Sequence, residues 1–227
     1  MAIRIALAGN PNCGKTTMFN ALTGANQYVG NWPGVTVEKK EGKLKNKKVK
    51  EEVIVTDLPG IYSLSPYTLE EVVSRDYLLK ENPDVIVDLV DATNIERNLY
   101  LTTQLIETGV PVVIALNMAD LLEKRGIKID VARLSMLLDC PIDLEDAVSA
   151  AAEVLPSSID ANKKRWYAVK FLEKDSKVAE SVKLTDSAAK KIEELRAGLE
   201  KSHDDDMESI VTDERYKFIQ KIVGTTV

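Results

Sequence analysis

Residues 9–16 read Gly9-Asn10-Pro11-Asn12-Cys13-Gly14-Lys15-Thr16 and match the pattern G-x-x-x-x-G-K-[ST]. The apolar run Ile3 to Ala8 before them predicts a buried strand, and a helical pattern from Lys15 to Leu22 follows. In this context backbone N–H groups surround phosphates, the Lys places a cation on the β and γ phosphates, and the Thr ligates Mg²⁺. The alternative is a chance Gly-rich turn. The expected nucleotide contacts are Asn10, Asn12, Cys13, Gly14, Lys15, Thr16 and Thr17.

A second motif, Asp57-Leu58-Pro59-Gly60, ends the strand-like segment Val49 to Thr56. The Asp57 carboxylate can hold Mg²⁺ through a water, and Gly60 lets the backbone approach the γ-phosphate. A strand that ends in Asp before a Pro-Gly turn is common. The motif therefore carries weight only because it follows the phosphate loop.

A third motif, Asn117-Met118-Ala119-Asp120, directly follows the strand-like run Pro111 to Leu116. It matches the N-K-x-D pattern of GTPases with Met in place of Lys. The Asp120 carboxylate can accept both hydrogen bonds that N1–H and the exocyclic amine of guanine offer, and adenine lacks this pair of donors. We therefore expect guanine binding by Asn117, Met118 and Asp120. The alternative is a strand-to-helix turn that Asp120 caps.

A switch segment is expected between the first two motifs. Thr36 is the only Thr of Gly34-Val35-Thr36-Val37 and could supply the second hydroxyl ligand of Mg²⁺. A Thr that simply enters a β-strand explains the residue equally well. Both interpretations stay open at this stage.

The pattern of strands and helices predicts a mostly parallel α/β sheet. Val35 to Leu44 and Val49 to Thr56 suggest a hairpin, and the runs Asp84 to Val90 and Pro111 to Leu116 suggest two more strands. Helical patterns at Leu69 to Leu79 and Ile95 to Ile106 precede these two runs. The predicted fold is a Ras-like P-loop GTPase domain with helices on both faces of the sheet, because each motif follows a strand.

The segment beyond about Pro141 has helical character throughout. Ile192, Leu195 and Leu199 share one face of a helix that starts near Thr185, and Tyr216, Ile219 and Ile222 share a face of the last helix. Packing within a small bundle accounts for both stripes. The predicted domains are 1–142 for nucleotide binding and 143–227 for the helical part. His203, beside three Asp residues, is expected in a solvated loop between helices.

Composition narrows the class of protein. A formal charge of −6 and a pI near 5.1 argue against a surface that binds nucleic acid. No apolar run approaches the ~20 residues that span a bilayer. Cys13 and Cys140 lack the spacing of a zinc site or a disulfide framework, and the N-terminus enters a strand without a leader pattern. A reducing, cytosolic location is expected.

Longer stretches resemble the FeoB family of prokaryotic ferrous iron transport proteins. The matching stretches are residues 9–17, 29–38, 57–64 and 90–99, and among them Asn31-Trp32-Pro33-Gly34-Val35-Thr36 is the most diagnostic. Residues 164–166 and 213–216 resemble the family's GDI-like helical domain, which slows GDP release. The resemblance implies a slow GTPase at the cytoplasmic face of the inner membrane, attached after Val227 to a membrane-spanning domain that carries Fe²⁺. The implied catalytic residues are Lys15, Asn12, Thr36 and Gly60, and the implied Mg²⁺ ligands are Thr16, Thr36 and Asp57.

The resemblance also implies a role for K⁺. Many GTPases orient the attacking water with a Gln just after the Asp-x-x-Gly motif, but this chain has Ile61 there, which excludes that mechanism. Members of the family use K⁺ where other GTPases use an arginine finger, held partly by the Asn that matches Asn12. A turn-forming Asn in a strained loop is the alternative interpretation of Asn12.

The guanine-contacting loop departs from the family pattern. Cys140-Pro141-Ile142 resembles the start of the expected final strand, but helical sequence follows almost at once. Ser149 and Ala150 could be the pair that contacts guanine, or part of an Ala-rich helix, and the helix is the favoured interpretation. Recognition of the base would then rest mainly on Asn117 and Asp120.

Two other functions remain open from the sequence. One is a nucleotide-responsive binding module without significant turnover, which K⁺-stimulated cleavage of GTP would exclude. The other is an assembly GTPase that acts on RNA or ribosomes, which the acidic charge disfavours and retention on RNA would revive. The sequence does not decide whether the chain forms a homo-oligomer.

Overall fold

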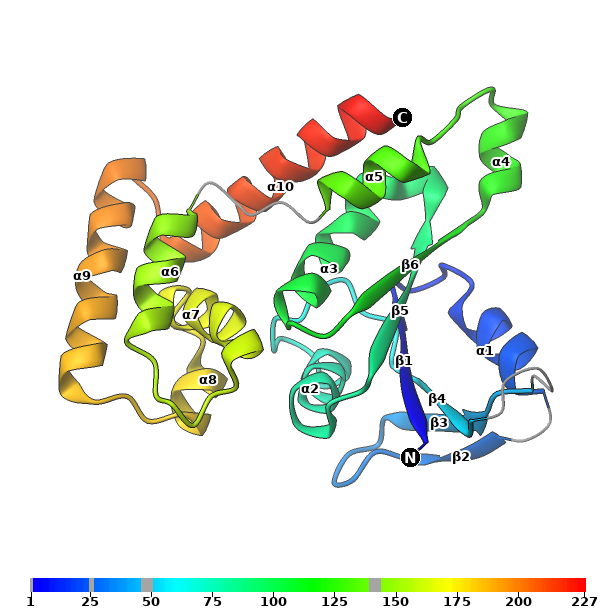
Figure 1. Ribbon diagram of the computed structural model, residues 1–227, viewed down its shortest axis with the longest axis horizontal. Helices are drawn as coiled ribbons and strands as arrows, with labels where there is room; N and C mark the ends of the chain where they lie inside the picture. The colour runs from blue at the N-terminus through cyan, green and yellow to red at the C-terminus, as the bar shows by residue number, and fades with distance from the viewer. Residues whose placement is uncertain (1, 25–26, 46–50, 139–143) are drawn as a thin grey trace. The chain divides into compact units, whose positions relative to one another are not determined.

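The structure of the chain is a computed structural model that describes residues 2–24, 27–45, 51–138 and 144–227. Contacts divide the chain into two compact units. The first unit contains residues 1–106 and 110–128, and the second contains residues 107–109 and 129–227 (Figure 1).

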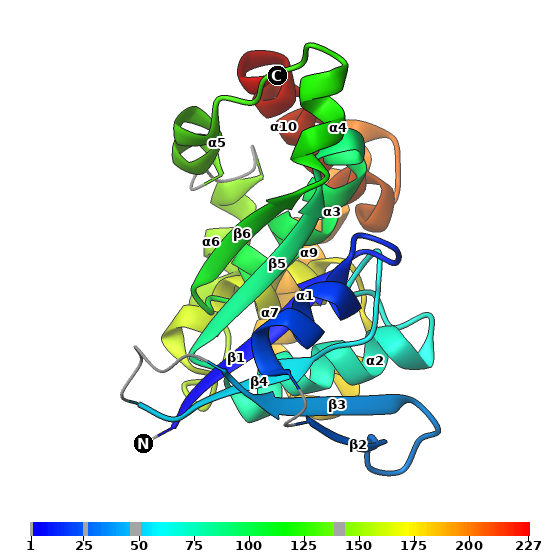
Figure 2. The same ribbon diagram turned by 90° about the vertical axis from the view of Figure 1, so that its right-hand side faces the viewer.

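A six-stranded sheet forms the centre of the first unit. Its strands are β1 (Ile3–Gly9), β2 (Gln27–Asn31), β3 (Glu38–Lys43), β4 (Val53–Asp57), β5 (Val85–Asp91) and β6 (Val112–Asn117). They are ordered β2-β3-β4-β1-β5-β6, with β2 and β3 at one end of the sheet (Figure 2). Strands β4, β1, β5 and β6 run parallel to one another, whereas β3 pairs antiparallel with both β2 and β4. The predicted mostly parallel sheet and its hairpin are confirmed.

Helices cover both faces of this sheet, as predicted. They are α1 (Lys15–Thr23), α2 (Leu69–Asp76), the π-helix η1 (Tyr77–Glu81), the 3₁₀ turn η2 (Ala92–Asn94), α3 (Ile95–Glu107) and α4 (Ala119–Lys124). Side chains of β1 alternate between two apolar clusters, because successive residues of a strand point to opposite faces. Ala6 and Ala8 join the cluster of α2 and α3, whereas Leu7 packs with Phe19 of α1. Figure 1 shows α1 on one side of the sheet and α2 and α3 on the other.

Three local features of the first unit differ from the predictions. Residues 27–31 form the edge strand β2, which the predicted elements did not include. β3 begins at Glu38 rather than Val35, because the backbone first closes a turn in which Trp32 N–H donates to Val37 O at 2.9 Å. The helix that begins at Leu69 continues as η1 up to Asn82, whose left-handed backbone ends it.

The second unit is helical in its described residues, as predicted. It comprises α5 (Val131–Leu137), α6 (Glu145–Glu153), the 3₁₀ turn η3 (Ala161–Lys163), α7 (Lys164–Leu172), α8 (Ser176–Ser181), α9 (Asp186–His203) and α10 (Met207–Thr226). Thr185 caps α9 and Asp206 caps α10, and His203 ends α9 at the connection between them. In the described part of the chain, no helix is both long and apolar enough to cross a membrane.

The predicted buried face of the last helix, formed by Tyr216, Ile219 and Ile222, is wrong at one position. Ile219 and Ile222 are buried, but Tyr216 is 39% exposed and its neighbour Arg215 is buried instead. Arg215 can enter the interior because two carboxylates, from Glu107 and Glu173, accept hydrogen bonds from it. Charge pairing therefore decides which residue of this turn faces inward.

The division by contacts falls earlier in the chain than the predicted boundary. Helix α5 belongs to the second unit, and Asp130 N–H donates to Thr226 O of α10 at 2.7 Å. This pairing is the physical reason for an earlier division, because it fastens residues 129–138 to the last helix. The predicted boundary at 142/143 and the predicted strand start at Cys140 to Ile142 lie outside the described residues.

Candidate nucleotide-binding site

The loop between β1 and α1 carries the first motif and lines a pocket of about 480 Å³. The pocket is lined by Asn10, Pro11, Asn12, Gly14, Lys15, Thr16, Thr17 and Gly60. Gly14 has φ +94°, and a Cβ atom there would lie 2.5 Å from Asn117 Nδ2. Only glycine combines this backbone with so close an approach. The structure thus brings most of the predicted phosphate-contacting residues around one cavity.

Lys15 and Asp57 from the first two motifs meet in this site. Lys15 Nζ donates to Asp57 Oδ1 at 2.5 Å, and both side chains are largely buried. A buried ammonium and carboxylate compensate each other, and removal of one partner leaves an uncompensated charge. Each charge of this pair is therefore compensated only while its partner stays in place.

Asn117 of the third motif is hydrogen-bonded to the backbone of the loop between β1 and α1. Its Nδ2 donates to Cys13 O at 2.8 Å, and Met118 has the left-handed backbone from which α4 begins. Asp120 lies in the first turn of α4, where its exposed carboxylate is 3.6 Å from Lys124 Nζ. Asn117 thus holds the loop, while the Asp120 carboxylate is accessible to a base.

The segment after Asp57 returns to the phosphate loop. Leu58 N–H donates to Leu7 O at 3.0 Å and Ile61 N–H donates to Gly9 O at 3.3 Å. A Cβ atom on Gly60 would lie 3.2 Å from the Cα of Pro11, so this close approach favours glycine. Ile61 is buried, and it therefore packs into the core at the position where many GTPases carry a Gln.

The predicted switch segment is anchored by an aromatic side chain. Trp32 is buried, its ring meets Tyr77 edge-on at 5.4 Å, and Lys39 Nζ lies 5.1 Å from its centroid. Val35 and Val37 pack on the same apolar cluster, whereas Thr36 between them is exposed. The two valines hold the turn and leave the Thr36 hydroxyl accessible from solvent.

Two predicted contacts have special surroundings. Both side-chain polar atoms of Asn10 are buried and have no hydrogen-bond partner within the described ranges, so a ligand or water could satisfy them. Burial raises the pKa of the Cys13 thiol, which keeps it neutral and unsuited to act as a nucleophile.

Ser149 and Ala150 lie inside α6 of the second unit, as the favoured helical interpretation predicted.

Asp88 is a buried acid that the motif-based prediction did not include. It lies in β5, 1% exposed, where it accepts a hydrogen bond from Thr102 Oγ1 at 2.6 Å. Desolvation raises the pKa of Asp88 to about 6, and the hydrogen bond from Thr102 opposes it with a smaller effect. An Asp within the apolar run Val85 to Val90 was the available signal, because buried strands rarely contain carboxylates.

We expect Asp88→Asn to stabilise the fold at neutral pH. Below pH 3.8 the Asp88 carboxyl is protonated in both the folded and the unfolded chain. Between that pH and about 6 the unfolded chain releases the proton first, so the free energy of unfolding falls as pH rises. The Asn variant avoids this loss, which amounts to at most about 3 kcal/mol. Urea unfolding of both proteins at pH 4 and pH 7.5 measures it.

The matched control for this prediction is Asp76→Asn, which neutralises an exposed carboxylate that pairs with Lys80. It should change the free energy of unfolding by less than about 1 kcal/mol at either pH. Equal stabilities of wild type and Asp88→Asn at pH 7.5 would contradict the prediction.

The donor set of the site suits hard cations. Thr16 and Asn12, which line the pocket, offer a hydroxyl and an amide oxygen, and Asp57, which pairs with Lys15, offers a carboxylate oxygen. No group of three or more His, Cys, Asp or Glu residues that could hold a metal occurs among the residues described. Mg²⁺ in nucleotide sites is held by one or two side chains together with phosphates, so this donor set fits it.

The comparisons with known proteins agree with this arrangement. The family model for ferrous iron transport protein B matches residues 3–153, and the model for the FeoB cytosolic helical domain matches residues 141–227. A Porphyromonas gingivalis Fe(2+) transport protein A/Fe(2+) transporter FeoB fusion protein is 52% identical over 159 residues, which cover 70% of this chain and 18% of that protein. The chain therefore spans about a fifth of the length of this curated relative.

Solved structures are similar over nearly the whole chain. A mutant of S. thermophilus NFeoB bound to mGDP has a TM-score of 0.94 and 45% identity, with 100% of both chains covered. S. thermophilus NFeoB bound to GDP.AlF4⁻ and K⁺ has a TM-score of 0.85 and 46% identity, with 97% of this chain and 98% of that one covered.

The fold and the three assembled motifs define a P-loop guanine-nucleotide-binding domain of the GTPase class, followed by a helical domain. Within that class, the chain belongs to the FeoB family and corresponds to its N-terminal G domain and cytosolic helical domain.

Proposed function

We propose that this chain binds GTP and hydrolyses it slowly to GDP and phosphate. The observation that supports this most directly is the pairing of Lys15 with Asp57 inside the pocket that the phosphate loop lines. In the bound state Lys15 contacts the β and γ phosphates, and Thr16, Thr36 and Asp57 are the oxygen ligands available to Mg²⁺. When bound, Mg²⁺ supplies the positive charge that phosphoryl transfer requires.

The absence of a Gln side chain leaves water positioning to the backbone. Ile61 is buried and has no group that could orient a water, so the backbone of Gly60 and of the segment around Thr36 is left for this task. Preorganised backbone N–H groups stabilise developing charge without reorganisation. Slow intrinsic turnover is the expected consequence.

K⁺ stimulation is the second part of the proposed function. The Asn12 amide oxygen belongs to the pocket-lining loop, and a structural relative carries K⁺ together with GDP.AlF4⁻. When bound, K⁺ supplies positive charge where other GTPases place an arginine. Asn12 would hold it through its side-chain oxygen.

We expect Asn12→Gly to abolish the difference between K⁺ and Na⁺ in single-turnover GTP hydrolysis. Asn12 has φ +65°, so glycine keeps the backbone free of strain and removes only the amide. Wild type should cleave GTP roughly 10²-fold faster in K⁺, the order of magnitude by which the loss of one preorganised electrostatic contact slows catalysis. Equal rates of the wild type in K⁺ and Na⁺, with hydrolysis in both, would contradict K⁺ activation alone. Binding of GTP without cleavage in either salt would favour the nucleotide-responsive module.

The physiological role that we propose is a regulatory switch. The curated relative is far longer than this chain, and its name describes a ferrous iron transporter. We infer that the nucleotide state of this chain, at the cytoplasmic face of the inner membrane, controls an attached membrane domain for Fe²⁺. The helical domain would contribute by slowing GDP release. Retention of the chain on RNA at moderate salt would instead support an assembly GTPase.

A further inference from the structure

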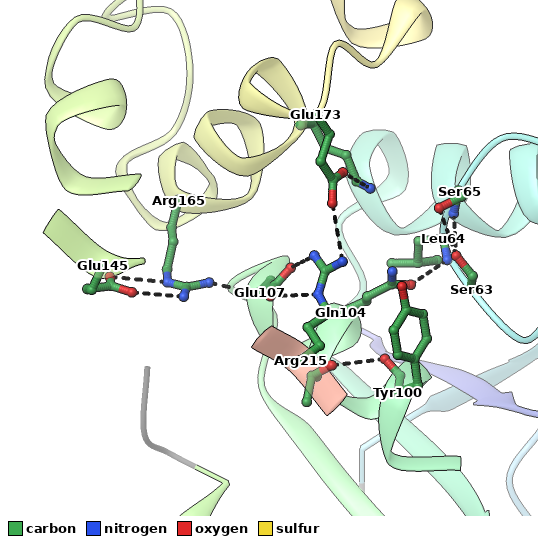
Figure 3. Close-up of polar contacts among 12 residues, drawn as sticks. Ser63, Leu64, Ser65, Tyr100, Gln104, Glu107, Glu145, Arg165, Glu173 and Arg215 are labelled. Atoms are coloured by element: carbon green, nitrogen blue, oxygen red, sulfur yellow. Dashed lines mark hydrogen bonds and ion pairs between the residues drawn. The ribbon is translucent and has the colours of Figure 1, made fainter. Parts of the chain in front are cut away.

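The last turn of α3 carries two buried polar side chains whose partners are distant in sequence. Gln104 is 1% exposed, and its Oε1 accepts a hydrogen bond from Leu64 N–H at 2.7 Å. Leu64 follows the Asp57-x-x-Gly60 motif by four residues and is itself buried. Figure 3 shows Gln104 directed at the turn that Ser63 and Ser65 close, where Ser65 N–H donates to Ser63 Oγ at 2.9 Å.

Only one of the two polar groups of the Gln104 amide forms a hydrogen bond among the described residues. Its Nε2 is buried and has no partner within the described residues. A buried, unsatisfied amide donor is unfavourable by about 1–3 kcal/mol, so packing alone does not account for an amide at this position. The Gln104 amide is therefore suited to a neighbouring segment that changes conformation. If the bond between Oε1 and Leu64 N–H is displaced, Nε2 can donate to a backbone carbonyl instead.

The second polar side chain, Glu107, is one helical turn further along and belongs to a charge network of the second unit. Arg215 Nη2 donates to Glu107 Oε2 at 2.8 Å, and Arg215 Nη1 donates to Glu173 Oε1 at 3.2 Å. Lys170 Nζ donates to Glu173 Oε2 at 2.6 Å, and Arg165 joins Glu145 to the same cluster (Figure 3). Two carboxylates face two buried cations, so the charges of this network, which lies within the second unit and includes Glu107, compensate one another.

We propose that Gln104 is a positioning residue for GTP hydrolysis, and that the Glu107–Arg215 pair sets where the Gln104 amide stands. This inference rests on the proposed function. One rigid helical turn joins the two side chains, so a displacement of Glu107 moves the acceptor of Leu64 N–H. Hydrogen bonds weaken steeply with distance and angle, and the segment behind Gly60 responds to that change. The helical domain thereby acts on the hydrolysis step through a single turn of α3.

The test uses residues 1–227 and compares four single variants and the double variant Gln104→Met/Glu107→Gln with wild type, in single-turnover GTP hydrolysis and in GTP affinity. Gln104→Met keeps the length of the side chain and removes the acceptor, whereas Gln104→Glu keeps an acceptor oxygen. Glu107→Gln weakens the pair with Arg215. Thr103→Val is the matched control, because it removes a buried hydroxyl of α3 whose acceptor, within the described ranges, is Tyr100 O of the same helix. Thermal unfolding establishes that each variant is folded.

We expect Gln104→Met to lower the hydrolysis rate constant roughly three- to tenfold, the equivalent of one hydrogen bond, with GTP affinity changed less than twofold. Gln104→Glu should retain most of the rate, and Thr103→Val should match wild type. Glu107→Gln should slow hydrolysis in the same way, and its effect should largely vanish in the Gln104→Met background. If the two residues had a structural role alone, Gln104→Met and Glu107→Gln would lower the thermal stability and leave the rate of GTP hydrolysis unchanged.

Three outcomes overturn the inference and are separable from failure of the proposed function. Hydrolysis by Gln104→Met at the wild-type rate removes Gln104 from the mechanism, and additive effects of the two substitutions remove the relay through Glu107. If Gln104→Met does not fold, Glu107→Gln decides alone, and an unchanged rate then rejects the proposal. Wild type that cleaves no GTP in a single turnover overturns the proposed function itself.

Discussion

Asp120→Asn is expected to exchange the base preference of this chain from guanine to xanthine. Guanine offers two donors, N1–H and the exocyclic amine, which a carboxylate accepts together. Xanthine offers N1–H and a C2 carbonyl, which match the oxygen and the NH₂ group of an Asn side chain. A site that leaves such groups unpaired rejects the wrong ligand by 10⁴-fold or more. The ratio of GDP to xanthosine diphosphate affinities should therefore change by about that factor.

The structure makes Asp120 available for this exchange. Its carboxylate is exposed and lies 3.6 Å from Lys124 Nζ, a surface pair of the kind that contributes about 1 kcal/mol or less. Loss of the Asp120–Lys124 ion pair on nucleotide binding would therefore cost little free energy. Calorimetric titration with both diphosphates and with ADP measures the preference.

The control for the base exchange is Glu123→Gln, which neutralises an exposed carboxylate on the same helix α4 and should leave both affinities unchanged. Unaltered guanine preference in folded Asp120→Asn would show that another group reads the base.

Lys15→Ala is expected to reduce GTP hydrolysis by about 10³-fold and to weaken binding of GTP. The variant removes the cation that we propose contacts the β and γ phosphates, and cationic contacts of this kind contribute factors of about 10³ or more to phosphoryl transfer. It also leaves the buried Asp57 carboxylate without the partner that lies 2.5 Å away in wild type. Both effects oppose an incoming triphosphate, because like charges then meet in the pocket.

The double variant Lys15→Ala/Asp57→Asn separates these two effects. Without Mg²⁺ it should recover part of the nucleotide affinity, because the unpaired carboxylate is gone. With Mg²⁺ hydrolysis should stay at least as slow as in the single variant, because Asp57 is also a proposed Mg²⁺ ligand. Lys43→Ala, which removes an exposed lysine that pairs with Glu52, serves as the control. Binding by fluorescence titration and single-turnover cleavage measure the two quantities. Lys15→Ala that hydrolyses GTP at the wild-type rate would refute the assigned role of Lys15.

Much of the fold could be predicted because it follows from short-range patterns. The buried run before Gly9 and the helical pattern after Lys15 identified β1 and α1 almost to the residue. The strand β2 was missed because Gln27 to Asn31 has little apolar character and forms an edge, where burial does not mark the residues. The interior position of Arg215 was missed because a charged residue on a helix is ordinarily predicted to face water.

The candidate site divides in the same way. The sequence by itself determined the three motifs and their order, because each is a contiguous run whose chemistry depends on local backbone and residue type. The tertiary structure decided how they meet: Lys15 with Asp57, 42 residues apart, and Asn117 with Cys13, 104 residues apart. It also decided the partners of Gln104 and Arg215, which lie 40 and 108 residues away. No local pattern encodes such pairs, because only packing of the sheet and helices brings these atoms within hydrogen-bonding distance.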